Sequence, residues 1–277
     1  MKKLSFTKMH GTGNDFVLLD ALRQPVRVTP ALARRLCDRR FGVGADQVLV
    51  LAKSPVADFK MLIYNADGSQ VEMCGNGIRC LARYASERGH TRKRQMTVET
   101  LAGVRTPKIE RGLVRVDMGA PVLDAAHVPT RAKGRVIDHP FSLTLRETTV
   151  DLSMTCVSMG NPHAVIFVED VSAVPLEDWG PVIETHSFFP RRTNVEFVQV
   201  KDPDHARVRV WERGSGATLA CGTGACAVAV AGVLTGRFHR TVTLTLPGGD
   251  LKVEWAADNR VYLTGPAAFV YEGVLRV

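Results

Sequence analysis

The chain has 277 residues, a length that suits two domains of about 130 residues each. Its net charge is +8, but no nucleic-acid recognition motif accompanies this charge, so we expect no nucleic-acid partner. No apolar run of about 18 residues indicates a membrane span, and residues 1–6 lack the apolar core of a signal peptide. We therefore expect a cytoplasmic protein with no membrane partner, whose six cysteines are free thiols.

The first part of the chain alternates short strands with helices. Its apolar segments between turn residues are predicted strands: 4–9, 16–19, 48–51 and 59–64. Thr29 and Pro30 provide an N-cap and a first-turn proline for a helix that should end near residue 40. The glycine-rich or turn segments between these elements carry Asn14, Gln47 and Asn65. Each of these amides faces either a ligand or solvent, and the local sequence does not decide between the two.

From residue 95 onward the pattern is rich in strands. The predicted strands are 96–101, 104–109, 114–118, 141–145, 149–152, 164–168, 195–200, 206–211, 242–246, 251–255, 261–264 and 269–277. A loop-like stretch at 120–129 is the candidate domain boundary. A helix is predicted at 176–188 with a break at Pro181, and another at 225–234. The latter is apolar on all sides, which indicates a helix buried in a core.

Two short stretches, one in each half of the chain, resemble each other. Residues 74–77 and 221–224 both read Cys-Gly-polar-Gly. Each runs into an apolar helical pattern that ends at a glycine, Gly89 or Gly236, 15 positions after its cysteine (89 − 74 and 236 − 221). A fixed offset of 221 − 74 = 147 residues marks a duplicated unit. We interpret the chain as two homologous halves, each presenting one thiol at a helix N-terminus.

A cysteine at a helix N-terminus is predicted to ionise easily, because unpaired N–H groups and the helix dipole favour the thiolate. The same N–H groups can bind a carboxylate or a phosphate. A metal site would use Cys74, Cys80, Cys221 and Cys226, whose spacings of six and five residues (80 − 74 and 226 − 221) are wider than usual. Thiol–disulfide exchange lacks a Cys-x-x-Cys motif. Proton transfer at carbon fits best, because a racemase without a cofactor needs an acid and a base on opposite faces of the stereocentre.

Taken in order, the motifs of the chain resemble the signature of the diaminopimelate epimerase family. The central motif is Asn65-x-Asp67-Gly68-Ser69-x4-Cys74-Gly75-Asn76-Gly77-x-Arg79. The accompanying motifs are Lys8-Met9-x-Gly11-x-Gly13-Asn14-Asp15-Phe16, Gly42-Val43-Gly44-Ala45-Asp46-Gln47, Gly160-Asn161-Pro162-His163, Thr193-Asn194-Val195-Glu196-Phe197 and Glu212-Arg213-Gly214 with Cys221-Gly222-Thr223-Gly224. Any one of these is weak, but all of them in this order, over nearly the whole chain, are highly specific.

The resemblance implies an isomerase that interconverts LL- and meso-2,6-diaminopimelate without a cofactor, in lysine and peptidoglycan-precursor biosynthesis. It implies an α/β (α+β) fold of two pseudo-symmetric halves, each a mixed β-sheet wrapped around a central helix. The halves would be residues 1–121, joined by the C-terminal tail 267–277, and residues 122–266. It also implies a homodimer, with the aromatic Tyr271 of a terminal edge strand at the interface.

The resemblance also assigns roles to individual residues. Cys74 and Cys221 would be the catalytic acid and base, and His163 and Glu212 would tune the two thiols. The residues that would bind the substrate are Asn14, Gln47, Asn65, Gly75, Asn76, Asn161, Asn194, Glu212, Arg213, Gly222 and Thr223. Gly75-Asn76 and Gly222-Thr223 would offer helix N-terminal N–H donors to the reacting carboxylate. Arg213 suits the distal carboxylate. No metal ligand is expected.

Two other functions remain open at this point. One is a proline racemase or hydroxyproline epimerase of the same fold, which also uses two cysteines. A small cyclic substrate would leave Arg213 and the amides without partners. The other is a non-catalytic small-ligand binder that kept the scaffold, and the intact cysteine pair argues against it.

Overall fold

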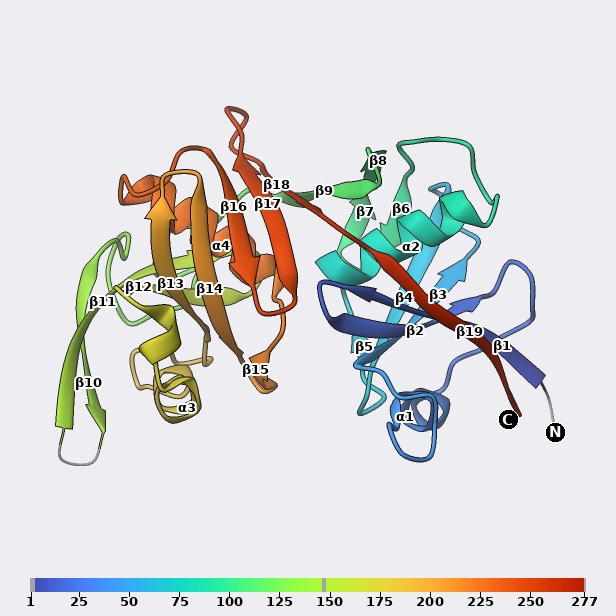
Figure 1. The fold of residues 1–277 in the computed structure, drawn as a ribbon, viewed down its shortest axis with the longest axis horizontal. Coiled ribbons are helices and arrows are strands. Elements are labelled where there is room, and N and C mark those ends of the chain that lie inside the picture. Colours follow the sequence, from blue (N-terminus) through green and yellow to red (C-terminus); the bar gives the residue numbers. More distant parts are fainter. Residues whose placement is uncertain (1–2, 146–147, 277) are drawn as a thin grey trace. The chain divides into compact units, whose positions relative to one another are not determined.

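The computed structural model describes residues 3–145 and 148–276, so the last residue of the predicted strand 269–277 lies outside the described residues. The chain forms two compact units, Met1–Asp117 with Thr264–Val277, and Met118–Leu263. Each unit contains a mixed sheet that packs against helices (Figure 1).

The first unit contains the helices α1 (Pro30–Cys37) and α2 (Gly75–Glu87). Its strands are β1 (Lys3–Gly11), β2 (Asn14–Asp20), β3 (Gln47–Ala52), β4 (Phe59–Asn65), β5 (Gln70–Val71), β6 (Val98–Thr100), β7 (Gly103–Arg105) and β19 (Ala268–Arg276). The strand order is β19-β1-β2-β3-β4-β6-β7, and β5 pairs with β4. The β2–β3 and β4–β6 pairs are parallel, which makes the sheet mixed. An antiparallel pair, β8 (Lys108–Glu110) and β9 (Leu113–Gly119), follows β7.

The central strands of this sheet are buried on both faces, because α1 and α2 cover opposite sides. Successive residues of a strand point to opposite faces. Val17 of β2 packs with Leu36 of α1 in one core cluster. Phe16 and Leu49 face the other way and approach Gly77 in the first turn of α2. The strands therefore read as continuous apolar runs, which is typical of strands covered on both faces.

Helix α1 begins as predicted but ends earlier. The side chain of Thr29 accepts a backbone N–H at 3.2 Å, which confirms the predicted N-cap. The helix ends at Cys37 instead of near residue 40. The Asp38 carboxylate accepts the backbone N–H groups of Arg40 and Phe41, both at 2.7 Å. These bonds give the backbone an alternative to a further helical turn.

The second unit contains α3 (Leu176–Glu184), α4 (Gly222–Leu234) and a 3₁₀ turn, Val171–Ala173. Its strands are β10 (His139–Leu145), β11 (Thr148–Ser158), β12 (Pro162–Phe167), β13 (Asn194–Asp202), β14 (His205–Glu212), β15 (Gly216–Thr218), β16 (Thr241–Leu246), β17 (Gly249–Trp255) and β18 (Val261–Gly265). Among these strands the order is β10-β11-β12-β13-β14-β16-β17-β18, and β15 pairs with β14. The β12–β13 and β14–β16 pairs are parallel.

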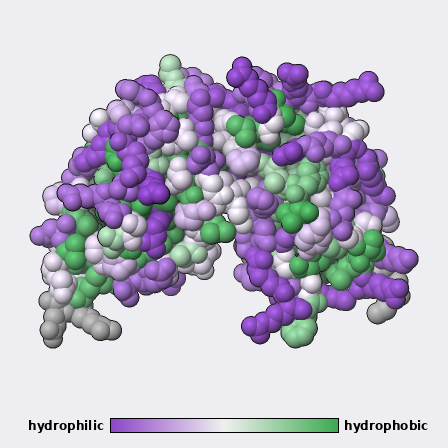
Figure 2. All heavy atoms as spheres, in the orientation of Figure 1, coloured by the Kyte–Doolittle hydropathy of each residue, from purple (hydrophilic) through white to green (hydrophobic). Residues whose placement is uncertain are grey.

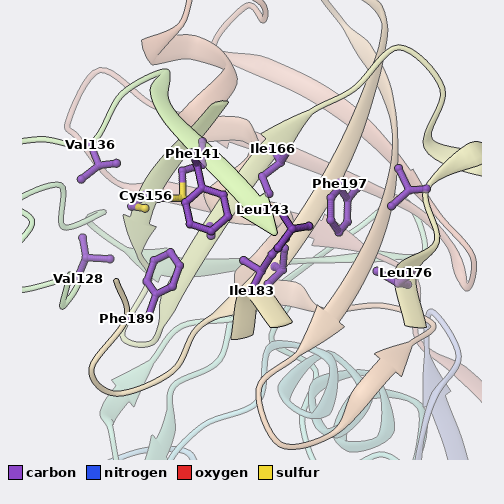
Figure 3. Close-up of a cluster of buried hydrophobic side chains, with 14 of the residues drawn as sticks. Val128, Val136, Phe141, Leu143, Cys156, Ile166, Leu176, Ile183, Phe189 and Phe197 are labelled. Atoms are coloured by element: carbon purple, nitrogen blue, oxygen red, sulfur yellow. The ribbon is translucent and has the colours of Figure 1, made fainter. Parts of the chain in front are cut away.

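Helix α3 packs on a cluster of buried side chains that includes Phe141 from β10 and Phe197 from β13 (Figure 3). Ile183 of α3 lies in the same cluster. The helix ends at Glu184 instead of at residue 188, and Pro181 lies inside it without breaking it. Burial against this cluster stabilises α3 despite the N–H that proline cannot donate. Helix α4 is buried along most of its length, as its apolar sequence predicted.

The second unit repeats the topology of the first. The series β11-β12-α3-β13-β14-β15-α4-β16 has the order of β1-β2-α1-β3-β4-β5-α2-β6, with parallel pairs at the same places. Helices α2 and α4 are followed by Gly89 and Gly236 at φ of 74° and 71°, a left-handed conformation that glycine adopts at little cost. The predicted fold class, two pseudo-symmetric halves with a mixed sheet around a central helix, is confirmed.

Hydrophilic side chains cover much of the face shown in Figure 2, and the apolar areas between them are separate. In the part of the chain that the structure describes, no helix has both the length and the apolar character needed to cross a membrane.

Candidate active site

Cys74 and Cys221 occupy the same structural position in the two units. Each is the N-cap of a buried helix, α2 or α4, with extended backbone angles (φ −139°, ψ 119° and φ −114°, ψ 115°). Each sulfur accepts the backbone N–H of the residue three positions later, Gly77 or Gly224, at 3.4 Å. Both thiols therefore lie at the positive end of a helix dipole, as the sequence predicted.

The predicted site residues form equivalent pairs at the offset of 147 that relates the two cysteines. The pairs are Asn14 and Asn161, Gln47 and Asn194, Asn65 and Glu212, Gly75 and Gly222, and Asn76 and Thr223. The strand registers repeat as well: the pairs Phe16–Gln47 and Val48–Tyr64 recur as His163–Asn194 and Val195–Trp211. The duplication therefore includes the site, and the residue types differ between the halves at several of its positions.

In the first unit, Asn14 lies beside the thiol. Its Oδ1 is 3.7 Å from the Cys74 sulfur and accepts the Asn76 amide at 3.3 Å. Gln47 and Asn65 are cross-strand partners, and Gln47 Nε2 donates to Asn65 Oδ1 at 2.8 Å. Gln47 Oε1 is buried and accepts no hydrogen bond from the described residues, which leaves an acceptor for a ligand. The predicted first-half residues therefore form two separate sets of contacts, one of Asn14, Cys74 and Asn76 and the other of Gln47 and Asn65.

A charged network holds the loop that carries Asn14, and the sequence analysis assigned no role to its members. Asn14 Nδ2 donates to Asp46 Oδ2 at 2.8 Å, so the amide oxygen is directed to Cys74. Asp15 pairs with the buried Lys8 at 2.7 Å and with Arg39 at 2.8 Å. Burial raises the pKa of the Asp15 carboxyl, but hydrogen bonds from Arg39, Lys8 and the Asp46 backbone outweigh this and hold it well below its ordinary value. Asp15 therefore stays charged and fixes the loop.

In the second unit the thiol lies among titratable groups. Cys221 is buried and contacts the Thr223 hydroxyl at 3.4 Å. Glu212, at the end of β14, accepts the Thr218 hydroxyl at 2.5 Å. His163, at the start of β12, is fully buried, and its Nε2 lies 3.0 Å from Asn161 Oδ1. The structure thus brings the predicted Asn161 and His163 into direct contact.

The predicted easy ionisation does not hold for Cys221 in this structure. Burial raises the pKa of its thiol well above the ordinary value, and the charges of Glu212 and Glu196 raise it further. Hydrogen bonds from Thr223 and the Gly224 N–H favour the thiolate but are outweighed. Burial also raises the pKa of the Glu212 carboxyl. Desolvation and neighbouring carboxylates therefore dominate over the helix dipole at this position.

Arg213 lies in the turn after β14, and Asn194 at the start of β13 anchors that turn. The Asn194 amide is buried; it accepts the Arg213 N–H at 2.9 Å and donates to the Pro162 carbonyl at 2.7 Å. Glu184, a buried carboxylate absent from the sequence analysis, accepts the Gly214 N–H at 3.0 Å. Asn194 and Glu184 thus position the turn, and the Arg213 side chain is left exposed.

Among the described residues, the structure contains no group of three or more His, Cys, Asp or Glu side chains that could hold a metal ion. Cys80 lies within α2, and burial raises the pKa of its thiol to about 12. Cys226 is likewise buried within α4.

The duplicated fold places one thiol at the equivalent helix N-terminus of each half, and the family and relatives that the chain matches show that it is an isomerase. The family model described as Diaminopimelate epimerase matches residues 6–123 and 155–270. Diaminopimelate epimerases of Moorella thermoacetica and Picosynechococcus sp. are 54% and 52% identical to the chain over 278 and 279 residues, covering 98% of this chain and 98% of each relative. The chain belongs to the diaminopimelate epimerase family.

Solved structures share the fold at much lower identity. A phenazine biosynthesis protein of the PhzF family from Bacillus anthracis matches with a TM-score of 0.72 and 15% identity, covering 100% of both chains. A hydroxyproline epimerase from Agrobacterium vitis matches with a TM-score of 0.70 and 14% identity, covering 99% of this chain and 91% of the other. At this identity the likeness shows the fold alone.

Proposed function

We propose that this protein interconverts LL- and meso-2,6-diaminopimelate by proton transfer between the substrate α carbon and two thiols, Cys74 and Cys221. The observation that carries the proposal is the identical placement of the two sulfurs. Each caps a helix N-terminus by accepting, at 3.4 Å, the backbone N–H of the residue three positions later. The family match and the relatives at about half identity support diaminopimelate as the substrate.

The reaction needs one thiolate and one thiol at the start. The thiolate takes the α proton, and the electron pair of the C–H bond passes to the carbanion that the carboxylate stabilises. The thiol then donates its proton to the opposite face, so that the configuration inverts and the two sulfurs exchange protonation states. Helix N-terminal N–H groups at Gly75-Asn76 and Gly222-Thr223 would stabilise the negative charge on the carboxylate as the proton leaves. The proposed mechanism uses no cofactor and no metal.

The remaining predicted residues would select the substrate. The exposed Arg213 would bind the distal carboxylate, and the neutral amides of Asn14, Gln47, Asn65 and Asn161 would hold the ammonium and carboxylate groups. The unpaired, buried Gln47 Oε1 suits an ammonium donor. Asn194, whose amide binds the backbone, would act mainly by placing the Arg213 turn.

Isotope exchange tests the proposal directly. The protein is incubated in heavy water with LL-diaminopimelate or with L-proline, and deuterium at the α carbon is measured together with the stereochemistry of the product. We expect deuterium and the meso form with diaminopimelate, and no exchange with proline. Exchange with proline alone would establish the proline racemase alternative, and exchange with neither substrate would favour a binding protein.

Three further expectations belong to this proposal. The functional halves are residues 1–121 with 267–277 and residues 122–266, close to the two compact units. The protein acts in the cytoplasm. It forms a homodimer through β19, the edge strand of the first sheet, on which Tyr271 is 47% exposed beside the exposed Val270. An exposed edge strand with apolar side chains can pair with a second copy.

A further inference from the structure

The two halves differ in the side chains that lie beneath the helix that each cysteine caps. In the first unit, a Cβ added at Gly77 would lie 3.0 Å from Leu49 Cδ2 and 3.5 Å from Phe16 Cε1. Both residues are fully buried and apolar. In the second unit, the equivalent positions at the offset of 147 are Glu196 and His163 (196 − 49 and 163 − 16). An ionisable pair thus replaces an apolar pair in an otherwise repeated scaffold.

The ionisable pair is in direct contact with the first turn of α4. Glu196 Oε1 lies 2.7 Å from His163 Nδ1, and both side chains have an exposed fraction of 0%. A Cβ added at Gly224 would lie 2.5 Å from Glu196 Oε1, so only glycine allows this approach. Gly224 is also the residue whose N–H bonds to the Cys221 sulfur. Glu196 therefore lies against the residue that donates its N–H to the Cys221 sulfur.

Such a placement is costly, and the scaffold does not require it. A buried carboxylate destabilises a fold unless it is paired and hydrogen-bonded. Glu196 Oε2 accepts no hydrogen bond from the described residues, so the pairing is incomplete. The first unit shows that Phe and Leu fill the same positions beneath the same kind of helix. The pair is therefore better explained by function than by packing.

We propose that Glu196 is a positioning residue that, through His163 and its own charge, makes the two thiols of the duplicated scaffold chemically unequal. Its Oε1 lies 2.7 Å from His163 Nδ1 and fixes the imidazole, whose Nε2 lies 3.0 Å from Asn161 Oδ1. It also places a negative charge below Cys221, which opposes loss of the thiol proton. The charged groups that act on Cys221 are Glu212 from β14 and Glu196 from β13, and His163 from β12 in turn acts on Glu212.

This inference rests on the proposed two-thiol function, but its test needs no turnover. In Glu196→Gln the side chain keeps its size and can still accept the Nδ1–H, and only the charge is removed. Alkylation by iodoacetamide is followed at both cysteines by peptide mapping from pH 6 to 10. We expect the pH profile of Cys221 alkylation to move to lower pH, with an alkylation rate at pH 8 about tenfold higher than in the wild type. The pH profile of Cys74 alkylation should stay in place. Turnover, where it is measured, should fall in kcat with KM unchanged.

A second variant separates charge from packing. His163→Phe with Glu196→Leu recreates in the second unit the apolar pair of the first, and should bring the Cys221 profile close to that of Cys74. The exposed Glu169→Gln is the control and should change neither profile. An unchanged Cys221 profile in both variants, an equal shift at both cysteines, or failure of both variants to fold would overturn the proposal. If the wild-type protein shows no turnover of diaminopimelate, the proposed function is overturned instead, and the alkylation result still tests this inference.

Discussion

Cys74 and Cys221 lie 147 positions apart and cap their helices with the same hydrogen bond. In each case the sulfur accepts, at 3.4 Å, the backbone N–H of the residue three positions later. Their surroundings are nevertheless unlike. Asn14 contacts the Cys74 sulfur, and the charges of Glu212 and Glu196 act on the Cys221 thiol. A reaction that starts from one thiolate and one thiol is served by such a difference, because two identical thiols would ionise together.

Replacing either cysteine by serine should abolish epimerisation while the protein stays folded. A serine hydroxyl has nearly the size of the thiol but is a far weaker acid, so it cannot carry the proton. We expect a loss of at least about a hundredfold in kcat for each variant. Circular dichroism and thermal melting check the fold. The buried Cys156→Ser provides a control outside the site, and full turnover in either Cys74→Ser or Cys221→Ser would refute the two-base mechanism.

Glu184→Gln should weaken substrate binding more than chemistry. The carboxylate accepts the Gly214 N–H at one oxygen and the Trp211 indole N–H, at 2.8 Å, at the other. An amide cannot accept both bonds, so the turn that carries Arg213 loses an anchor. We expect KM to rise about tenfold, with a stability loss of about 1–3 kcal/mol. Glu177→Gln, an exposed carboxylate of the same helix, should leave KM unchanged, and an unchanged KM in Glu184→Gln would show that the turn needs no such anchor.

Asp15→Asn should destabilise the protein more at neutral pH than in acid. The folded-state pKa of Asp15 lies below its unfolded value, so its contribution is present above about pH 4 and is lost as the pH falls below that. We expect a loss of about 2–3 kcal/mol at pH 7 in denaturant titrations, shrinking as the pH is lowered towards 3. The exposed Asp204→Asn is the control. A pH-independent difference would show that the charge of Asp15 is not what stabilises the loop.

The sequence predicted the duplication because glycines and cysteines recur at one offset, and the buried helix α4 because its residues are apolar on all sides. It placed most strands within a few residues. It did not predict the end of α1, which depends on the Asp38 side chain binding two backbone N–H groups. It gave no role to Glu184 or Glu196, since their partners are distant in sequence. A lone carboxylate in the apolar strand 195–200 was the available signal for Glu196.

Tyr271→Ala should weaken self-association without changing the fold of the monomer. The tyrosine ring packs edge-on against Phe6 at a centroid distance of 6.0 Å, and 47% of the side chain is exposed on the edge strand β19. Light scattering at micromolar concentration should give a dimer mass for the wild type and a lower average mass for the variant. The exposed Leu101→Ala, away from this strand, is the control. A monomer mass for the wild type would contradict the proposed dimer.

Gly224→Ala and Gly77→Ala form a matched pair, because the two glycines occupy the same position in α4 and α2. Alanine favours a helix over glycine by about 1 kcal/mol, so an unhindered substitution would stabilise each unit. At Gly77 the new methyl would meet Leu49 Cδ2, the end of a flexible side chain, at 3.0 Å. At Gly224 it would meet the Glu196 carboxylate at 2.5 Å and the Cys221 Cβ at 3.2 Å, and neither can move without disturbing a buried hydrogen bond.

We therefore expect Gly77→Ala to stay near wild-type stability and Gly224→Ala to lose about 1–3 kcal/mol in denaturant titrations. Because the displaced groups are Glu196 and Cys221, the proposed acid or base, kcat should fall at least about tenfold in Gly224→Ala and much less in Gly77→Ala. Differential scanning calorimetry and initial rates on the two purified variants make the comparison. Equal effects of the two substitutions would mean that the carboxylate beneath α4 does not constrain the second unit more than Leu49 constrains the first.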